Sequence, residues 1–382
     1  MRAYQSAEVF FGIEDLCAVG TLEAREFVTH ILPWGYYNAS VQTVKQRYLV
    51  NAAYDWSLII LAPLWALLLG LALGLTPLGV PRYPLFGRTE SSLSLFSGVF
   101  TMAHLSIVFF RSHANPSIFK LYPRRFVLVP LLLFTALMLS SWVLVFAFIV
   151  SVWWDVYHSG LQTFGFGRLY DARHNADRDA GRSLDRGFNL ILYTGPIFAG
   201  ASLFQHVEHF REFADVGSPK LAALADSIMS RQPVWTALTI GIAVPYLLYY
   251  VWGYYRLIRK GYVVSREKVA LYLATGLCSV WAWGFNPFGQ AFFIMNFFHS
   301  LQYFALVGHT ERPHLTERLG LSGFRWGRAF TFSAIIFLGV VYGIWAQFRG
   351  QSNHLSFSIL IAVSLLHFWY DSFIWSVRKG QV

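Results

Sequence analysis

Long apolar runs follow one another along most of this chain, and they constrain its fold more than any other feature. Ten of them approach the roughly 20 residues that a helix needs to cross a lipid bilayer. They span residues 55–75, 92–110, 126–139, 142–164, 189–204, 234–255, 269–285, 287–308, 329–348 and 355–376. The stretch 126–164 is too long for one span, so we divide it at Ser140 and Ser141. The sequence therefore predicts an all-α integral membrane protein with about ten transmembrane helices.

The charges are distributed unevenly over the loops between these runs. Only 13% of the residues are charged and 55% are hydrophobic, which is typical of membrane proteins. If the N-terminus is cytoplasmic, 24 of the 30 Lys and Arg residues fall on the cytoplasmic side. This bias follows the positive-inside rule, so we expect both termini in the cytoplasm. The net charge of +10 then needs no nucleic-acid partner, and the mixed-charge stretch 168–186 is expected to be a solvated cytoplasmic loop.

The chain divides into three expected segments. Residues 1–54 form an interfacial or cytoplasmic segment, residues 55–376 form the polytopic helical domain, and residues 377–382 form a cytoplasmic tail. Acidic residues such as Glu8 and Glu14 interrupt the first segment, so it is not a signal peptide. Two cysteines are too few for a disulfide framework or a CxxC metal site. We expect a multi-pass protein of a bacterial inner membrane. Membrane lipids are its expected partners.

Two apolar runs end in nearly the same motif. One reads DVYHSGLQTF, from Asp155 to Phe164, and the other reads NFFHSLQYF, from Asn296 to Phe304. Each begins with Asp or Asn, places an aromatic residue before His-Ser, and continues with Leu-Gln. Imidazole and amide groups are costly in hydrocarbon unless they are paired. We therefore expect the two segments to line opposite walls of one cavity.

Four histidines lie at similar depths in the expected helices. At about 1.5 Å rise per residue, each is roughly 10–20 Å from the predicted cytoplasmic edge. Their four helices run in the same direction, so they should form one layer of metal ligands: His104, His158, His299 and His367. Three further histidines are expected as metal-binding residues at the cytoplasmic mouth just below: His113, His174 and His309. The plainer alternative is that each intramembrane histidine bonds only to a neighbouring helix.

Polar side chains recur three or four residues from these histidines and so share their helix faces. A metal-ligating histidine usually needs such a partner to fix its tautomer and orientation. The expected catalytic or supporting residues are Asp155, Gln162, Gln302, Tyr303 and Asp371. The alternative for each glutamine is a bond that ties its helix to a neighbour.

Imidazoles with carboxylates and no cysteine suit iron, copper or zinc. A site in the hydrocarbon zone implies a lipophilic substrate that arrives from the bilayer. A non-haem iron site that activates O₂ agrees with both the donor set and the apolar location. We expect one or two iron ions, with at least one open coordination position. The sequence thus predicts an O₂-dependent oxygenase or oxidase acting on a carotenoid, another isoprenoid or a lipid, with an electron donor on the cytoplasmic side.

The C-terminal part of the chain resembles the Brp/Blh family of bacterial membrane β-carotene dioxygenases. The matching residues are Phe297, His299 and Ser300 in one helix, followed by His367, Asp371, Phe373 and Ile374 in the last. The resemblance covers about 80 residues and implies His299 and His367 as iron ligands, with an isoprenoid substrate. The early P-H-x-x-x-D segment of that family is absent. The wider class of histidine-rich membrane iron enzymes is a second analogue, but its H-x-x-x-H and H-x-x-H-H clusters are also missing.

Three other classes remain open at this point. A b-type haem protein would use axial histidine pairs. A membrane-bound acyltransferase would use a single intramembrane histidine. A proton-coupled transporter could use Asp155, Asp371 and the histidines as a relay. Bound metal and an absorption spectrum separate these classes from a non-haem iron enzyme.

Overall fold

A computed structural model describes residues 47–74, 76, 83–85, 88–175, 177–286 and 288–375. All of them belong to one compact unit, Gln46–Val382. Most of the segment expected at 1–54, and the tail expected at 377–382, lie outside the described residues. Within the described part the chain is helical, apart from one short antiparallel hairpin formed by β1 (Tyr83–Leu85) and β2 (Arg88–Glu90).

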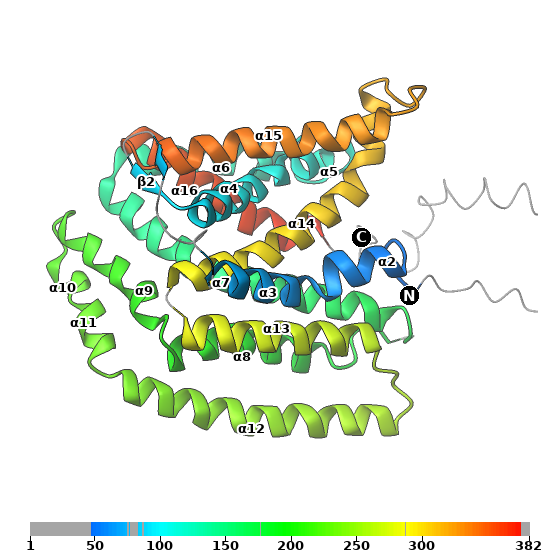
Figure 1. The fold of residues 1–382 in the computed structure, drawn as a ribbon, viewed down its shortest axis with the longest axis horizontal. Helices are drawn as coiled ribbons and strands as arrows, with labels where there is room; N and C mark the ends of the chain where they lie inside the picture. The colour runs from blue at the N-terminus through cyan, green and yellow to red at the C-terminus, as the bar shows by residue number, and fades with distance from the viewer. Residues whose placement is uncertain are drawn as a thin grey trace, which may run out of the picture. The chain divides into compact units, whose positions relative to one another are not determined.

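The helices follow one another with short connections (Figure 1). They are α2 (Ala52–Asp55), η1 (Trp56–Ile60), α3 (Ala62–Gly74), α4 (Ser92–Ser112), α5 (Pro116–Leu121), α6 (Pro123–Leu139), α7 (Ser141–Ala172), α8 (Arg182–Ala199), α9 (Leu203–Val207), η3 (Glu208–Ala214), α10 (Pro219–Ala222), α11 (Leu224–Met229), α12 (Gln232–Arg259), α13 (Arg266–Phe285), α14 (Phe288–Arg318), α15 (Gly327–Arg349) and α16 (His354–Ile374).

Six of these helices, α4, α7, α12, α14, α15 and α16, are long and apolar enough to cross a membrane. Two bent pairs, α2–η1 with α3 and α8 with α9–η3, raise the number to eight if each pair is one span. The chain is thus a multi-pass membrane protein with six to eight candidate spans among its described residues, and the prediction of about ten was too high. The two remaining runs do form helices. However, α6 has only 17 residues, and α13 begins with the charged sequence Arg266, Glu267 and Lys268.

The predicted division at Ser140 and Ser141 is confirmed. α6 ends at Leu139 and α7 begins at Ser141. Ser140 adopts an extended conformation between them, and its hydroxyl accepts a hydrogen bond from the backbone N–H of Val143 at 3.3 Å. A serine in this position satisfies one of the free N–H groups at the start of a helix, so the sequence itself separates two helices that hydropathy would merge.

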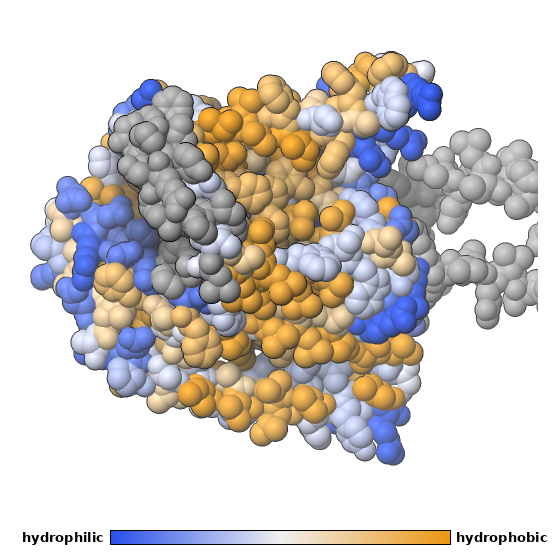
Figure 2. All heavy atoms as spheres, in the orientation of Figure 1, coloured by the Kyte–Doolittle hydropathy of each residue, from blue (hydrophilic) through white to orange (hydrophobic). Residues whose placement is uncertain are grey.

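α14 is the central helix of the described unit. In the apolar segment of α14 that could cross a membrane, 83% of the residues are buried inside the protein. In the corresponding segment of α12, at the edge of the bundle, the share is 0%. Figure 1 shows α14 passing between α15 and α4 on one side and α3 and α13 on the other. In Figure 2 hydrophobic residues cover the middle of the visible face, and hydrophilic residues gather toward its two ends, as expected of a protein surrounded by lipid.

Two glycines bring α15 close to α4, the helix that carries His104. A Cβ atom at Gly343 would lie 2.2 Å from the backbone oxygen of Val99, and one at Gly339 would lie 3.1 Å from Ile107. Small residues four apart allow helix backbones to approach closely in membranes. This contact holds α15 against α4 next to His104.

Only part of the mixed-charge stretch 168–186 is the solvated loop expected from sequence, since residues 177–179, 182 and 183 are exposed. α7 continues to Ala172, and Arg168, Asp171 and Asp185 are buried. Arg168 donates to Asp185 at 2.8 Å and to the carbonyls of Arg178 and Ala180.

The buried amine of Lys268 on α13 completes this cluster. It contacts the Asp171 carboxylate, lies 3.4 Å from Asp185 and donates to the Tyr254 hydroxyl at 2.7 Å. Hydropathy could not predict this burial, because it scores each charged residue alone. In the structure, the two cations and two carboxylates of this cluster neutralise one another. The cluster ties α7, α8, α12 and α13 together.

We predict that Lys268→Met destabilises the protein by about 3–5 kcal/mol, because it leaves two buried carboxylates with only one cation, Arg168, between them. Lys260→Met is the matched control, since Lys260 is exposed and its replacement should change stability by less than about 0.5 kcal/mol. Thermal unfolding of both variants in detergent measures the difference. Equal unfolding temperatures would show that the cluster does not hold the helices.

Candidate metal centre

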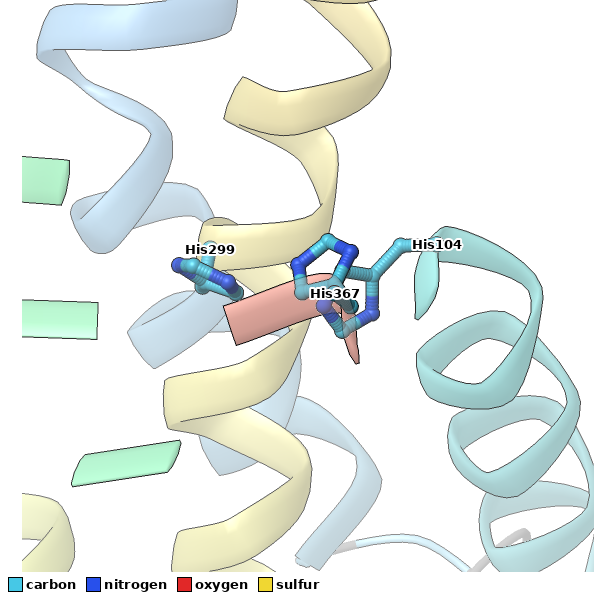
Figure 3. Close-up of side chains that lie close together, drawn as sticks. All are labelled: His104, His299 and His367. Carbon is cyan, nitrogen blue, oxygen red and sulfur yellow. The ribbon is translucent and has the colours of Figure 1, made fainter. Parts of the chain in front are cut away.

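Four buried imidazoles from four helices meet inside the described unit. His104 comes from α4, His158 from α7, His299 from α14 and His367 from α16, and each is at most 7% exposed. Figure 3 shows three of them, His104, His299 and His367, with their rings close together. The prediction that these histidines converge is confirmed.

The rings form a closed cycle. The ring centroids of His104 lie 5.1 Å from His299 and 4.9 Å from His367. Those of His158 lie 4.9 Å from His299 and 5.0 Å from His367. Neighbouring rings stand at 76–88° to one another, so each pair meets edge to face.

Most ring nitrogens in this cycle lack a hydrogen-bond partner within the described part of the chain. They are Nε2 of His104 and His158 and both nitrogens of His299 and His367. A buried polar group without a partner costs about 1–3 kcal/mol. A protein rarely leaves several such groups together, and bound metal would satisfy nitrogens of these rings.

Ser300 orients one of the rings. Its hydroxyl lies 2.8 Å from Nδ1 of His104. If the serine accepts from Nδ1–H, the lone pair of Nε2 remains for the centre. This is the role of the serine that follows histidine in the second repeat, and sequence reasoning did not assign it.

Asp371 is the carboxylate of the centre. Its Oδ2 lies 3.6 Å from Nε2 of both His158 and His367. Its Oδ1 accepts hydrogen bonds from the Tyr303 hydroxyl and from Nε1 of Trp375, each at 2.9 Å. Two donors therefore hold one oxygen and turn the other toward the imidazoles. Trp375 was missed in the sequence, although it stands four residues after Asp371, where a helical partner is expected.

These side chains fit a metal ion. Two groups bring their ligand atoms within 4.8 Å of one another: His104 with His299 and His367, and His158 with His367 and Asp371. An ion about 2.1 Å from each nitrogen would place neighbouring ring centroids about 4.6 Å apart for right-angled ligands and about 5.3 Å apart for tetrahedral ones. The observed separations of 4.9–5.1 Å lie between these limits.

The two repeats contact each other directly, where a cavity between them was expected. Besides the pair of histidines, Gln162 donates to Oε1 of Gln302 at 2.9 Å and to the His299 carbonyl at 3.1 Å. Gln302 in turn donates to the carbonyl of Ile59 in η1 at 2.8 Å. The amides thus brace α7, α14 and η1. This geometry favours the tying role over the catalytic role that we expected for the two glutamines.

The first positions of the repeats also meet. The Asp155 carboxyl is in hydrogen-bonding contact with the side chain of Asn296. We expected Asp155 to orient His158 on its own helix, but the carboxylate that faces His158 is Asp371 of α16. Helical spacing identified the correct face of α7 and could not show which neighbouring helix supplies the partner.

The three histidines expected below the centre are not brought into it. His113 has both ring nitrogens occupied, by the Ser112 hydroxyl at 2.8 Å and the Phe126 carbonyl at 3.1 Å. His174 is exposed after the end of α7, and His309 is half-buried on α14. Neither metal-binding group found among the described residues includes them.

A buried ion pair lies beside the centre. Arg111 donates to Glu311 at 2.6 Å, and its guanidinium stacks 4.5 Å from the centroid of the Trp375 ring. Glu311 also accepts from Asn115 at 2.8 Å. We counted Arg111 only as a topogenic charge from sequence. In the structure it joins α4 to α14 and supports the tryptophan that holds Asp371.

Comparison of the chain with family models, with curated proteins and with solved structures found no match. The assignment of a metal centre therefore rests on the geometry of its side chains alone.

We predict that His299→Ala and His367→Ala lose bound metal, because each removes a member of the cycle. Asp371→Asn should weaken metal affinity by about 10–100-fold, and Asp155→Asn should have a smaller effect, since Asp155 faces Asn296. His174→Ala and His309→Ala serve as controls that retain metal. The measurement is the metal content per folded molecule after purification in detergent. Full metal content in His299→Ala would place the site elsewhere.

Proposed function

We propose that the chain is a membrane metalloenzyme that holds non-haem iron in the four-histidine centre and oxidises a lipophilic molecule with O₂. The observation that carries the proposal is the cycle of four buried imidazoles with unpartnered nitrogens, which with Asp371 form two overlapping groups of possible metal ligands. Imidazole and carboxylate donors without thiolate suit iron, copper or zinc. Bound iron would supply one-electron chemistry with O₂, which apolar substrates need because they offer no acidic or electrophilic group.

The residues have separate tasks in this proposal. The four histidines would hold one or two ions, and the Ser300 hydroxyl lies 2.8 Å from Nδ1 of His104, so Nε2 is the nitrogen left for metal. Asp371 presents one oxygen beside two imidazoles, close enough to hold or accept a proton at Oδ2. Tyr303 and Trp375 keep that carboxylate in place through its other oxygen. The buried surroundings keep water away from the reacting atoms.

The geometry is less favourable to the other classes. A b-type haem needs an open plane between two axial rings, whereas here the centroids of neighbouring rings are only 4.9–5.1 Å apart. An acyltransferase needs one histidine near a polar acyl donor and has no use for four. A proton relay would pass along a line of hydrogen-bonded groups, whereas most of these nitrogens have no hydrogen-bond partner among the described residues.

Nitric oxide tests the central claim without knowledge of the substrate, because it binds ferrous iron at an open position. We expect the protein loaded with Fe²⁺ under anaerobic conditions to give the paramagnetic signal of an iron–nitrosyl complex, and His299→Ala to lose it. Gln162→Ala should lower the thermal stability and keep the signal per folded molecule, because Gln162 braces helices. A loaded protein that gives no signal would have a closed, structural metal site, and the oxygenase proposal would fail.

We also propose that both termini face the cytoplasm. An even number of spans, six or eight, places the two ends on the same side, and the Lys and Arg residues of the two end segments favour the inner side. A single cysteine at Lys379, in a chain without Cys17 and Cys278, should resist a membrane-impermeant thiol reagent in intact cells. Labelling at this position would overturn the orientation.

A further inference from the structure

An apolar cavity of about 580 Å³ lies along the N-terminal half of α7. One wall is a strip of α7 from Trp142 to Tyr157, with side chains spaced three and four residues apart. The other wall is formed by Phe210, Phe213 and Leu221. These three belong to residues 208–222, which we call the cap. The volume falls within the range of about 300–1,000 Å³ that is usual for small-molecule sites.

The cap makes this strip a binding cavity and not a bare lipid-facing surface. α8 and α9–η3 meet at 100°, so the chain turns sharply there, and the cap packs against α7. Nε1 of Trp142 donates to the Ser218 hydroxyl at 3.0 Å, and the Trp142 ring lies 5.7 Å from that of Phe213. One side stays accessible from the bilayer, since Phe146 is 48% exposed.

The far end of the strip borders the metal centre. Trp154 lines the cavity and stands one helical turn before His158 on the same face of α7. Its ring lies 6.3 Å from that of Phe368, whose ring is 5.0 Å from His158 and 5.7 Å from His367. Trp154 and Phe368 are thus the side chains between the cavity and the imidazoles.

The two ends of the strip carry different contacts. The Trp142 end meets the Ser218 hydroxyl at 3.0 Å. At the other end the Trp154 ring packs beside Phe368, and the exposed Tyr157 hydroxyl accepts a hydrogen bond from Arg186 at 3.1 Å. The strip covers 15 residue steps of helix, or about 22 Å at 1.5 Å per residue, which suits an extended chain better than a compact ring system.

We propose that this cavity holds one linear hydrocarbon chain, acyl or isoprenoid, with its polar head at Trp142 and its apolar end at Trp154 and Phe368 beside His158. The inference rests on the proposed function and names its substrate class and orientation. Reaction would then occur toward the apolar end of the chain, away from the head.

The test uses a stearic acid analogue with a photoreactive diazirine near its methyl end, added to the purified, metal-loaded protein in detergent. We expect saturable labelling of peptides that contain Trp154 or Phe368, and competition by unlabelled stearic acid. Competition by a linear isoprenoid alcohol, compared with stearic acid, then distinguishes the two kinds of chain. Labelling around Trp142 instead would overturn the orientation.

Two matched Val→Trp variants control for simple lipid contact. Val150→Trp fills the cavity and should reduce labelling to the level seen with excess stearic acid. Val341→Trp lies on the lipid-facing side of α15 and should leave labelling unchanged. Equal, unsaturable labelling of both variants would mean annular lipid only and would overturn the proposal.

Metal content measured on the same samples separates the two proposals. Saturable labelling of a protein that binds no metal would contradict the proposed enzyme activity and support the binding cavity. Bound metal with the nitrosyl signal, but without saturable labelling, would contradict the binding cavity and support the enzyme activity.

Discussion

The contact between α7 and α14 is the interaction on which the rest of the structure depends. Three positions of one repeat meet their counterparts in the other: Asp155 with Asn296, His158 with His299, and Gln162 with Gln302. Each polar group that would be costly in lipid is placed against its own equivalent. This explains why the chain carries the motif twice, since pairing at both ends of the contact fixes the register in which the two histidines face each other.

The polar groups of this contact are not equally satisfied. Gln162 and Gln302 bond to each other, whereas Nε2 of His158 and both nitrogens of His299 have no hydrogen-bond partner among the described residues. Without a ligand, the unpartnered nitrogens oppose folding at about 1–3 kcal/mol each. A bound ion would remove this cost only in the folded state, so metal binding and helix packing should be coupled. The polar centre would then be tolerable in the membrane with its ligand bound.

Sequence reasoning placed the helices and the four histidines well and their partners poorly. Helical periodicity gives the face and depth of a residue such as His158, and the serine cap at Ser140 marks a boundary that hydropathy hides. The rotation of each helix about its own axis, which decides that Asp371 and not Asp155 faces His158, depends on long-range packing. The burial of Lys268 was unpredictable for the same reason, because its counter-charges come from other helices.

No helix contributes more than one histidine to the cycle, and this distribution has a consequence for how the centre forms. A pair of histidines on one helix could bind metal before the helices assemble, as short H-x-x-x-H clusters can. Here one candidate group takes its ligands from α4, α14 and α16, and the other from α7 and α16, so each forms only after its helices have packed. The buried pair Arg111–Glu311 and the cluster around Lys268 lie on different helix contacts and fix this packing in register, a role for which buried charges are better suited than for stability alone. The candidate metal centre therefore depends on the packing of α4, α7, α14 and α16.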